Sequence, residues 1–259
     1  MSEIIYLSPS APVNMADEWF EIATADHFWM KRRFDVLCRL TAEVDFRSRR
    51  IAEIGCGQGV LQRQFEQKFG VKPAGFDLNE NALRNSVAQD HPRYCYNIFD
   101  RDPNFAAAFD TIVMFDVLEH LEDELSFLEA VLYHLQPGGL LLINVPALMS
   151  LYSRYDTALG HQRRYTLKTL DAVCLKLQLQ PVNATYWGLP FIPLLVARRL
   201  LLSWQSDPRK IARQGYKPPG ALGNQLLGFW GKLDPLPQKI IGTSLMVTYQ
   251  KAAVPAGEG

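Results

Sequence analysis

Short apolar runs alternate with amphipathic segments along the first 145 residues of the chain. The apolar runs predict strands over 51–54, 72–76, 94–98, 109–114 and 140–145, and the segments between them predict helices over 17–40, 60–69, 79–89 and 122–135. Strands that alternate with helices of this length are typical of βαβ units. The pattern therefore predicts an α/β fold whose parallel sheet is buried on both faces.

The pattern changes after residue 145. A helix is predicted over 166–177, and two more strands over 182–187 and 244–249. The segment between these strands, 188–241, is rich in Leu, Trp, Pro and Arg, and a structureless loop of that length is improbable. We therefore predict a helical insertion there, within a single domain that covers 1–259.

Composition narrows the class of protein. The 259 residues include 27 Lys plus Arg and 27 Asp plus Glu, so no net charge steers the chain to nucleic acid. Four cysteines without a CxxC pair are expected to be reduced thiols of a cytoplasmic protein. Residues 1–12 lack the pattern of a signal peptide, and no apolar run is long enough to span a membrane.

A glycine-rich loop follows the first predicted strand of the sheet. The spacing Gly55-x-Gly57-x-Gly59 differs from the dinucleotide fingerprint, because Val60 stands where that fingerprint has its last glycine. Glu53 precedes the loop, and its carboxylate suits the ammonium and sulfonium of S-adenosylmethionine (SAM). The spacing favours SAM over NAD. Asp77 ends the next strand and suits the ribose hydroxyls of either cofactor.

Polar residues at the third predicted strand are candidates for contact with adenine. Asn97 falls where the strand is expected to stop, and the N–H of Ile98 is placed to face the ring. For Asp100 we favour a surface turn.

Several motifs in order carry a family resemblance. They are Glu53-x-Gly55-x-Gly57-x-Gly59, Asp77, Phe109-Asp110, Asp116-Val-Leu-Glu119-His120 and Leu135-x-Pro137-Gly138-Gly139. Over about 50–145 the chain resembles the class I SAM-dependent methyltransferases, most of all the branch that includes the ubiquinone-biosynthesis O-methyltransferases.

This resemblance implies a fold and a cofactor site. The fold is a Rossmann-like sheet of seven strands, the last antiparallel, with an N-terminal helical lid in 1–48. The cofactor is SAM, and the product is S-adenosylhomocysteine. The implied cofactor-binding residues are Glu53, Gly55, Cys56, Gly57, Gly59, Asp77, Leu78, Asn97, Ile98, Asp116 and Val117.

Acceptors such as phenols and alcohols need a base in addition to alignment with the cofactor. We predict His120 and His161 as catalytic candidates, although either histidine also fits a purely structural role. The same alternative holds for the predicted substrate-binding residues, which are Trp29, Arg33, Glu119, Tyr155, Arg163 and Arg164. The remaining histidines at 91 and 134 are predicted at the surface. No ligand spacing implies a metal.

The segment Trp187–Trp204 is apolar with a tryptophan at each end, and 198–217 holds six basic residues against Asp207. Four interpretations stay open for this part of the chain: peripheral contact of 187–217 with the inner membrane surface, a lid over an apolar substrate, a homodimer contact, or a helical cap.

For the whole chain we predict SAM-dependent methyl transfer, by in-line displacement, to a small-molecule or lipid-like acceptor through oxygen. The alternatives are a SAM-binding regulatory protein without catalysis and an NAD-dependent oxidoreductase.

Overall fold

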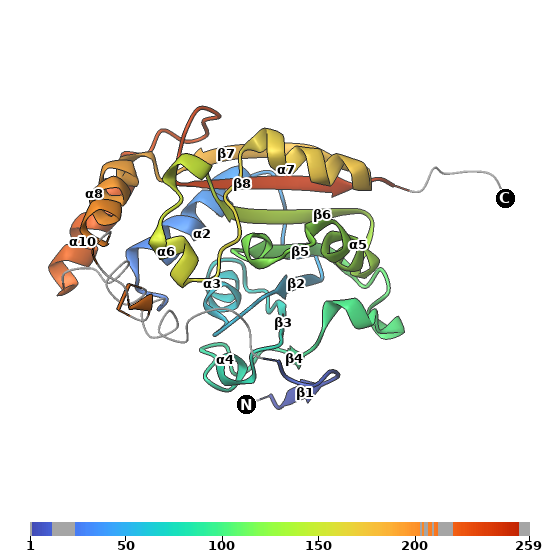
Figure 1. Ribbon diagram of the computed structural model, residues 1–259. Coiled ribbons are helices and arrows are strands. Elements are labelled where there is room, and N and C mark those ends of the chain that lie inside the picture. The colour runs from blue at the N-terminus through green and yellow to red at the C-terminus, as the bar shows by residue number, and fades with distance from the viewer. Residues whose placement is uncertain are drawn as a thin grey trace.

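The computed structural model describes residues 2–11, 24–202, 204, 207–208, 210–211 and 220–253. Its centre is an eight-stranded sheet in the order β1-β4-β3-β2-β5-β6-β8-β7 (Figure 1). The strands are β1 (Ile4–Tyr6), β2 (Ile51–Ile54), β3 (Ala74–Asp77), β4 (Arg93–Cys95), β5 (Phe109–Phe115), β6 (Leu135–Pro146), β7 (Leu179–Trp187) and β8 (Ser244–Lys251). The first six strands pair in parallel, and β8 runs antiparallel to both β6 and β7.

Helices cover both faces of this sheet. Leu128 and Leu170, from α5 and α7, belong to one apolar core, whereas Leu37 and Leu61, from α2 and α3, belong to the other. The α-helices are α2 (Phe28–Leu40), α3 (Val60–Phe69), α4 (Glu80–Arg84), α5 (Glu124–His134), α6 (Arg154–Ala158), α7 (Leu167–Cys174), α8 (Ile192–Leu202) and α10 (Gly220–Gly231). Single 3₁₀ turns cover Ile98–Asp100, Pro103–Phe105, Leu118–His120, Met149–Leu151, Leu175–Leu177 and Leu189–Phe191. Among the described residues, no helix has the length and hydropathy needed to cross a membrane.

The predicted α/β sheet is present, but the count of seven strands is wrong. The extra strand, β1, pairs in parallel with β4 inside the segment predicted as a helical lid. Two of its three residues are exposed, so it shows no apolar run. The helix predicted over 79–89 ends at Arg84. The helix predicted from residue 17 is described from Phe28 onward, and 12–23 lie outside the described residues.

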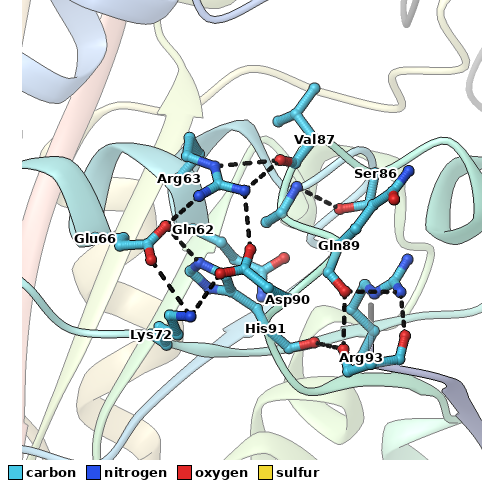
Figure 2. Close-up of polar contacts among 12 residues, drawn as sticks. Gln62, Arg63, Glu66, Lys72, Ser86, Val87, Gln89, Asp90, His91 and Arg93 are labelled. Carbon is cyan, nitrogen blue, oxygen red and sulfur yellow. Dashed lines mark hydrogen bonds and ion pairs between the residues drawn. The ribbon is translucent and has the colours of Figure 1, made fainter.

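Two histidines predicted at the surface are buried. Figure 2 shows His91 beside Glu66 of α3, with 3.1 Å between Nε2 and Oε2, inside a network that also contains Arg63, Lys72 and Asp90. His134 lies between the carbonyl of residue 130 and the Tyr96 hydroxyl. Both imidazoles join elements that are distant in sequence, which no local pattern reveals.

Trp187, at the end of β7, links three elements. Its indole is fully buried and lies 4.4 Å, centroid to centroid, from the ring of Trp29 in α2. Its Nε1 donates a hydrogen bond of 2.9 Å to Oδ1 of Asn144 in β6. The N-terminal helix is therefore anchored to the antiparallel end of the sheet.

Replacing this anchor is expected to destabilise the protein strongly. Trp187→Ala removes a large buried ring and leaves a cavity, so the free energy of unfolding should fall by about 3–5 kcal/mol. The half-exposed Val182 lies on the same strand, and Val182→Ala should change it by no more than about 0.5 kcal/mol. Urea unfolding of both variants measures the difference. Equal losses would contradict the anchoring role.

Candidate active site

The loop between β2 and α3 needs glycine for its backbone conformation. Gly55, Gly57 and Gly59 all have positive φ, at 73°, 51° and 69°. A Cβ atom on Gly55 would lie 2.5 Å from Cγ2 of Val117, so this loop also packs closely on the chain that follows β5. Gly59 ends the loop as the residue that precedes α3. The loop thus presents backbone, without side-chain cover, at the carboxyl end of the strands.

Asp77 ties the end of β3 to this loop. One carboxylate oxygen accepts a 2.7 Å hydrogen bond from the N–H of Gly57, and the other accepts a 2.8 Å bond from the N–H of Asn79. Burial raises the pKa of this carboxyl above its ordinary value. Each oxygen keeps further acceptor capacity, because a carboxylate offers about four lone-pair sites. Asp77 can therefore hold the loop and accept hydrogen bonds from a ribose as well.

A cavity of about 280 Å³ opens beside the loop. Apolar side chains from Ile98, Phe115 and Leu121 form part of its wall and suit a flat base. Ten of the eleven predicted cofactor-binding residues line it, namely Glu53, Gly55, Cys56, Gly57, Asp77, Leu78, Asn97, Ile98, Asp116 and Val117. The eleventh, Gly59, does not line the cavity.

Glu53 is a buried carboxyl in this cavity with one oxygen, Oε2, that lacks a hydrogen bond from the described residues. Burial raises the pKa of Glu53 to about 8, against the opposing effect of Arg33. A buried carboxyl with an unused oxygen fits a cationic group of a ligand, because the cation offsets the cost of ionising it there. The residues present therefore fit a cofactor with an ammonium or sulfonium.

An ion pair connects the N-terminal helix α2 to the end of β5. Nη1 of Arg33 lies 2.6 Å from Oδ2 of Asp116, and Nδ2 of Asn144 donates a 2.7 Å hydrogen bond to Oδ1. Asp116 has a φ of 57°, an unfavourable conformation for a residue with a side chain, which these two partners hold in place. Arg33, predicted as a substrate-binding residue, lines the cofactor cavity.

A second cavity of about 80 Å³ adjoins the first, and the walls of both include Asp116 and His120. Of the predicted catalytic and substrate-binding residues, Trp29, Glu119, His120, Tyr155, His161 and Arg164 line this second cavity. Arg163 does not line it, because its guanidinium pairs with Glu124 at 3.0 Å. We refer below to the two spaces as the cofactor cavity and the acceptor cavity.

Helix α8 supplies two wall residues that the sequence reasoning missed. Leu195 and Arg198 line the acceptor cavity, and the guanidinium of Arg198 lies 3.9 Å from the centroid of the Tyr155 ring. The sequence placed Arg198 in a basic segment with four open interpretations, one of them a lid over an apolar substrate. The available signal was the three-residue spacing of Leu195 and Arg198, which puts both on one helix face.

His161 is held by a carboxylate that is itself held by an arginine. Nδ1 of His161 lies 3.1 Å from Oδ1 of Asp156, and Nε of Arg164 lies 2.7 Å from the same oxygen. Burial would raise the pKa of Asp156, but the hydrogen bond from His161 and the charge of Arg164 lower it to about 2. Because Asp156 is ionised, Nδ1 carries the proton and Nε2 is free to accept one.

Glu119 and His120 complete the polar wall. Glu119 is fully buried, neither of its carboxylate oxygens accepts a hydrogen bond from a described residue, and Nε2 of His161 lies 4.0 Å from Oε1. Burial and the nearby Asp116 raise the pKa of Glu119 well above its ordinary value. Burial and His161 lower the pKa of His120 to about 3, so this imidazole is neutral but weakly basic.

The fold gathers these three groups although the sequence shows no metal-ligand spacing. The candidate ligand atoms of Glu119, His120 and His161 all lie within 4.8 Å of one another, and the two rings meet edge to face at 4.8 Å. Two of the groups are adjacent in sequence, and the third comes from a loop about 40 residues away. The prediction that no metal is implied stays a prediction.

Comparison with known proteins places this site in context. A family model described as a methyltransferase domain matches residues 28–193. A ubiquinone biosynthesis O-methyltransferase of Marinobacter nauticus is 27% identical over 109 residues, which cover 39% of this chain and 45% of that protein. The match therefore spans less than half of the relative.

Solved structures share the fold at low sequence identity. Phosphoethanolamine N-methyltransferase 2 of Haemonchus contortus, in complex with SAM, aligns with a TM-score of 0.56 and 19% identity over 86% of this chain and 53% of that one. The [4+2]-cyclase SpnF aligns with a TM-score of 0.57 and 14% identity, over 86% and 81% of the two chains.

The buried carboxyl of Glu119 is expected to reduce stability. Because its pKa is raised in the folded state, the protein should lose stability as the pH rises above about 4.5, the ordinary value. Glu119→Gln should therefore raise the free energy of unfolding at pH 7 by about 1–3 kcal/mol, with a gap that widens with pH. Urea unfolding between pH 5 and 8 measures this gap. The exposed Glu122 in the same loop provides the control Glu122→Gln, which should show no such trend.

Proposed function

The chain belongs to the methyltransferase-domain family of class I, SAM-dependent enzymes, and we propose that it methylates an oxygen of a small or lipid-like acceptor. The observation that carries this proposal is the junction of the two cavities at Asp116 and His120. A cofactor on the glycine-loop side and an acceptor on the histidine side would meet there. Such a junction allows the in-line approach that methyl transfer requires.

SAM would supply an activated methyl group on a sulfonium, with a good leaving group. Four groups that line the cofactor cavity fit the other parts of SAM. Glu53 fits its ammonium or sulfonium, and Arg33 fits its carboxylate. Asp77 fits the ribose hydroxyls, and the N–H of Ile98 fits adenine. Walls of apolar side chains limit the access of water, which strengthens these interactions. The main task of the protein is then to align and desolvate the reacting atoms.

An oxygen acceptor must also lose a proton. We assign this role to His161, which lines the acceptor cavity while Asp156 holds its Nδ1. The arrangement follows the general rule that a base is oriented by a third group. His120, with its pKa lowered to about 3, is the weaker base of the two and fits better as a neutral wall of the cavity.

The side chains that line the acceptor cavity indicate which kind of acceptor it would bind. Trp29, Tyr155 and Leu195 give this cavity an apolar side, which favours an aromatic or lipid-like group that carries a hydroxyl. The name of the relative in Marinobacter nauticus supports an oxygen acceptor of this kind. The structure neighbour that methylates nitrogen resembles this chain in fold alone.

A second candidate function is cofactor binding without methyl transfer. The [4+2]-cyclase SpnF has the same fold, so the fold by itself does not require methyl transfer. Formation of S-adenosylhomocysteine with cell extract distinguishes the two candidates, since a protein that only binds SAM forms none.

The proposed function is tested with SAM that carries a deuterated methyl group. Aqueous and lipid extracts are incubated with the protein and screened for compounds that gain 17 mass units, as expected for transfer of CD₃ to a position that loses hydrogen. If the compound with the added mass contains no nitrogen and is not hydrolysed under conditions that cleave esters, the result supports a methyl ether. Transfer to a nitrogen-only acceptor would overturn the choice of oxygen.

Cofactor affinity should depend on pH through Glu53. In the free protein its pKa is about 8, and a cationic ligand favours the ionised form, so binding releases a proton at neutral pH. SAM affinity should therefore rise with pH up to about 8, by as much as about tenfold per unit. Calorimetry from pH 6 to 9 measures the slope, and Glu53→Gln should flatten it. The same slope in both proteins would contradict the assignment.

Removal of the proposed base should lower turnover more than binding. His161→Ala should reduce kcat by about 10²–10⁴-fold and leave SAM affinity within about twofold, while Asp156→Asn should give a smaller loss. The exposed neighbour Gln162 provides the control Gln162→Ala, which should turn over normally. Initial rates across a pH range measure the effect. A loss of affinity without a loss of kcat would assign His161 to binding instead.

A further inference from the structure

Helix α10 exposes most of its large apolar side chains, whereas Leu227 packs against the core. Gly223 and Gly231 are buried, and Asn224 on the same face accepts a 2.8 Å hydrogen bond from the N–H of Phe28. The opposite face shows Leu222, Leu226 and Phe229, and Leu233 follows two residues after the helix; each of the four is 60–69% exposed. A helix that packs against a protein core has the reverse distribution, with large apolar residues inside and polar residues outside.

The small inward side chains let α10 approach α2 closely. A Cβ atom on Gly231 would lie 3.1 Å from Cζ of Phe191, and one on Gly228 would lie 3.9 Å from Cβ of Phe28. Leu222, Leu226 and Phe229 recur at intervals of four and three residues, so they lie on one face of the helix. No residue of the sequence Gly220–Gly231 is charged. The outer face of α10 therefore has the composition of a contact surface rather than of a solvated one.

Helix α8 lies at the same end of the molecule as α10 (Figure 1). Leu195 and Arg198 point toward the acceptor cavity, whereas Leu201 is 77% exposed and Trp204, just beyond the helix, is 93% exposed. We call Leu201, Trp204, Leu222, Leu226, Phe229 and Leu233 the outer apolar surface.

The charge of this part of the chain identifies its partner. Residues 187–243 hold eight lysines and arginines against two aspartates, while the whole chain is neutral. Of those two acids, Asp234 is buried and accepts hydrogen bonds from the N–H groups of Gly188 and Leu189. Lys232 and Lys239, close to the outer apolar surface in sequence, are exposed. Apolar side chains flanked by exposed cations complement an anionic lipid interface.

A second copy of the chain is a poorer match. Two copies that met through this surface would bring two strongly basic segments together, and like charges in apposition disfavour association. An anionic bilayer has an apolar interior for the exposed Leu and Phe side chains and a negative surface for the lysines.

We propose that the outer apolar surface docks on anionic lipid bilayers, with α10 lying in the interface. Leu222, Leu226, Phe229 and Leu233 enter the region between headgroups and acyl chains, and the flanking lysines contact lipid phosphates. Docking needs neither the cofactor nor turnover, so it stands apart from the proposed reaction. It brings the lipid phase next to α8, whose other face lines the acceptor cavity.

Flotation with vesicles tests the proposal. The full chain is mixed with phosphatidylglycerol vesicles or phosphatidylcholine vesicles at low salt and centrifuged through a density gradient. The intact protein should float with phosphatidylglycerol, much less with phosphatidylcholine, and should detach as salt rises because screening weakens the attraction. Leu226→Glu/Phe229→Glu should reduce the bound fraction at least tenfold.

Matched variants separate docking from general effects. Leu175 and Val182 are half-exposed apolar residues elsewhere in the fold, and Leu175→Glu/Val182→Glu should float like the intact protein. Lys232→Glu/Lys239→Glu replaces two exposed cations outside the outer apolar surface, and it should lower the salt concentration at which the protein detaches. Circular dichroism checks that each variant is folded.

Three outcomes would overturn the proposal. The first is an intact protein that stays in the soluble fraction with phosphatidylglycerol at low salt. The second is flotation that survives Leu226→Glu/Phe229→Glu in a folded variant. The third is a dimer in analytical ultracentrifugation that these two substitutions dissociate without any effect on vesicle binding, which would assign the surface to a second copy.

Discussion

The ion pair between Arg33 and Asp116 is the contact on which the rest of the site depends. It joins α2 to the end of β5, where the cofactor cavity and the acceptor cavity meet. Asn144 bonds to the second carboxylate oxygen of Asp116 and accepts a hydrogen bond from Trp187. One connected set of polar groups thus fixes the helix, the strained backbone at Asp116 and two further strands. Loss of one partner would leave a charge inside the protein without compensation.

Buried carboxyl groups are concentrated around these cavities at a cost to folding. Burial raises the pKa of Glu53, Asp77 and Glu119 above the ordinary values. Buried carboxyl groups destabilise the free protein, because ionising them there costs more than in water. Their presence is explained by a ligand that carries positive charge and by polar chemistry at the acceptor. The unfavourable electrostatics of the free protein is then part of how it favours a cationic cofactor.

The sequence predicted those parts of the structure that depend on local spacing. The glycine loop, Asp77 and the helix over 60–69 follow from patterns of a few residues, and the structure has the same boundaries for that helix. The strand β1 was missed because three half-exposed residues carry no periodic signal. The approach of His161 to Glu119 could not be predicted, because it depends on how the loop after β6 folds back over the sheet. Long-range packing, rather than spacing, creates it.

The size of the acceptor cavity gives α8 a further role. An engineered apolar cavity of about 150 Å³ binds benzene, and the acceptor cavity has about 80 Å³. We therefore expect one wall to move outward when an aromatic or lipid-like acceptor binds. Trp29 is buried in the core beside Trp187, whereas Leu202 is the one buried residue of α8 and packs with Tyr155 and Ile211 in a small separate cluster. Helix α8 is thus the wall that is most easily displaced. The same helix carries part of the outer apolar surface, so the entry of the acceptor and the proposed contact with lipid involve one element.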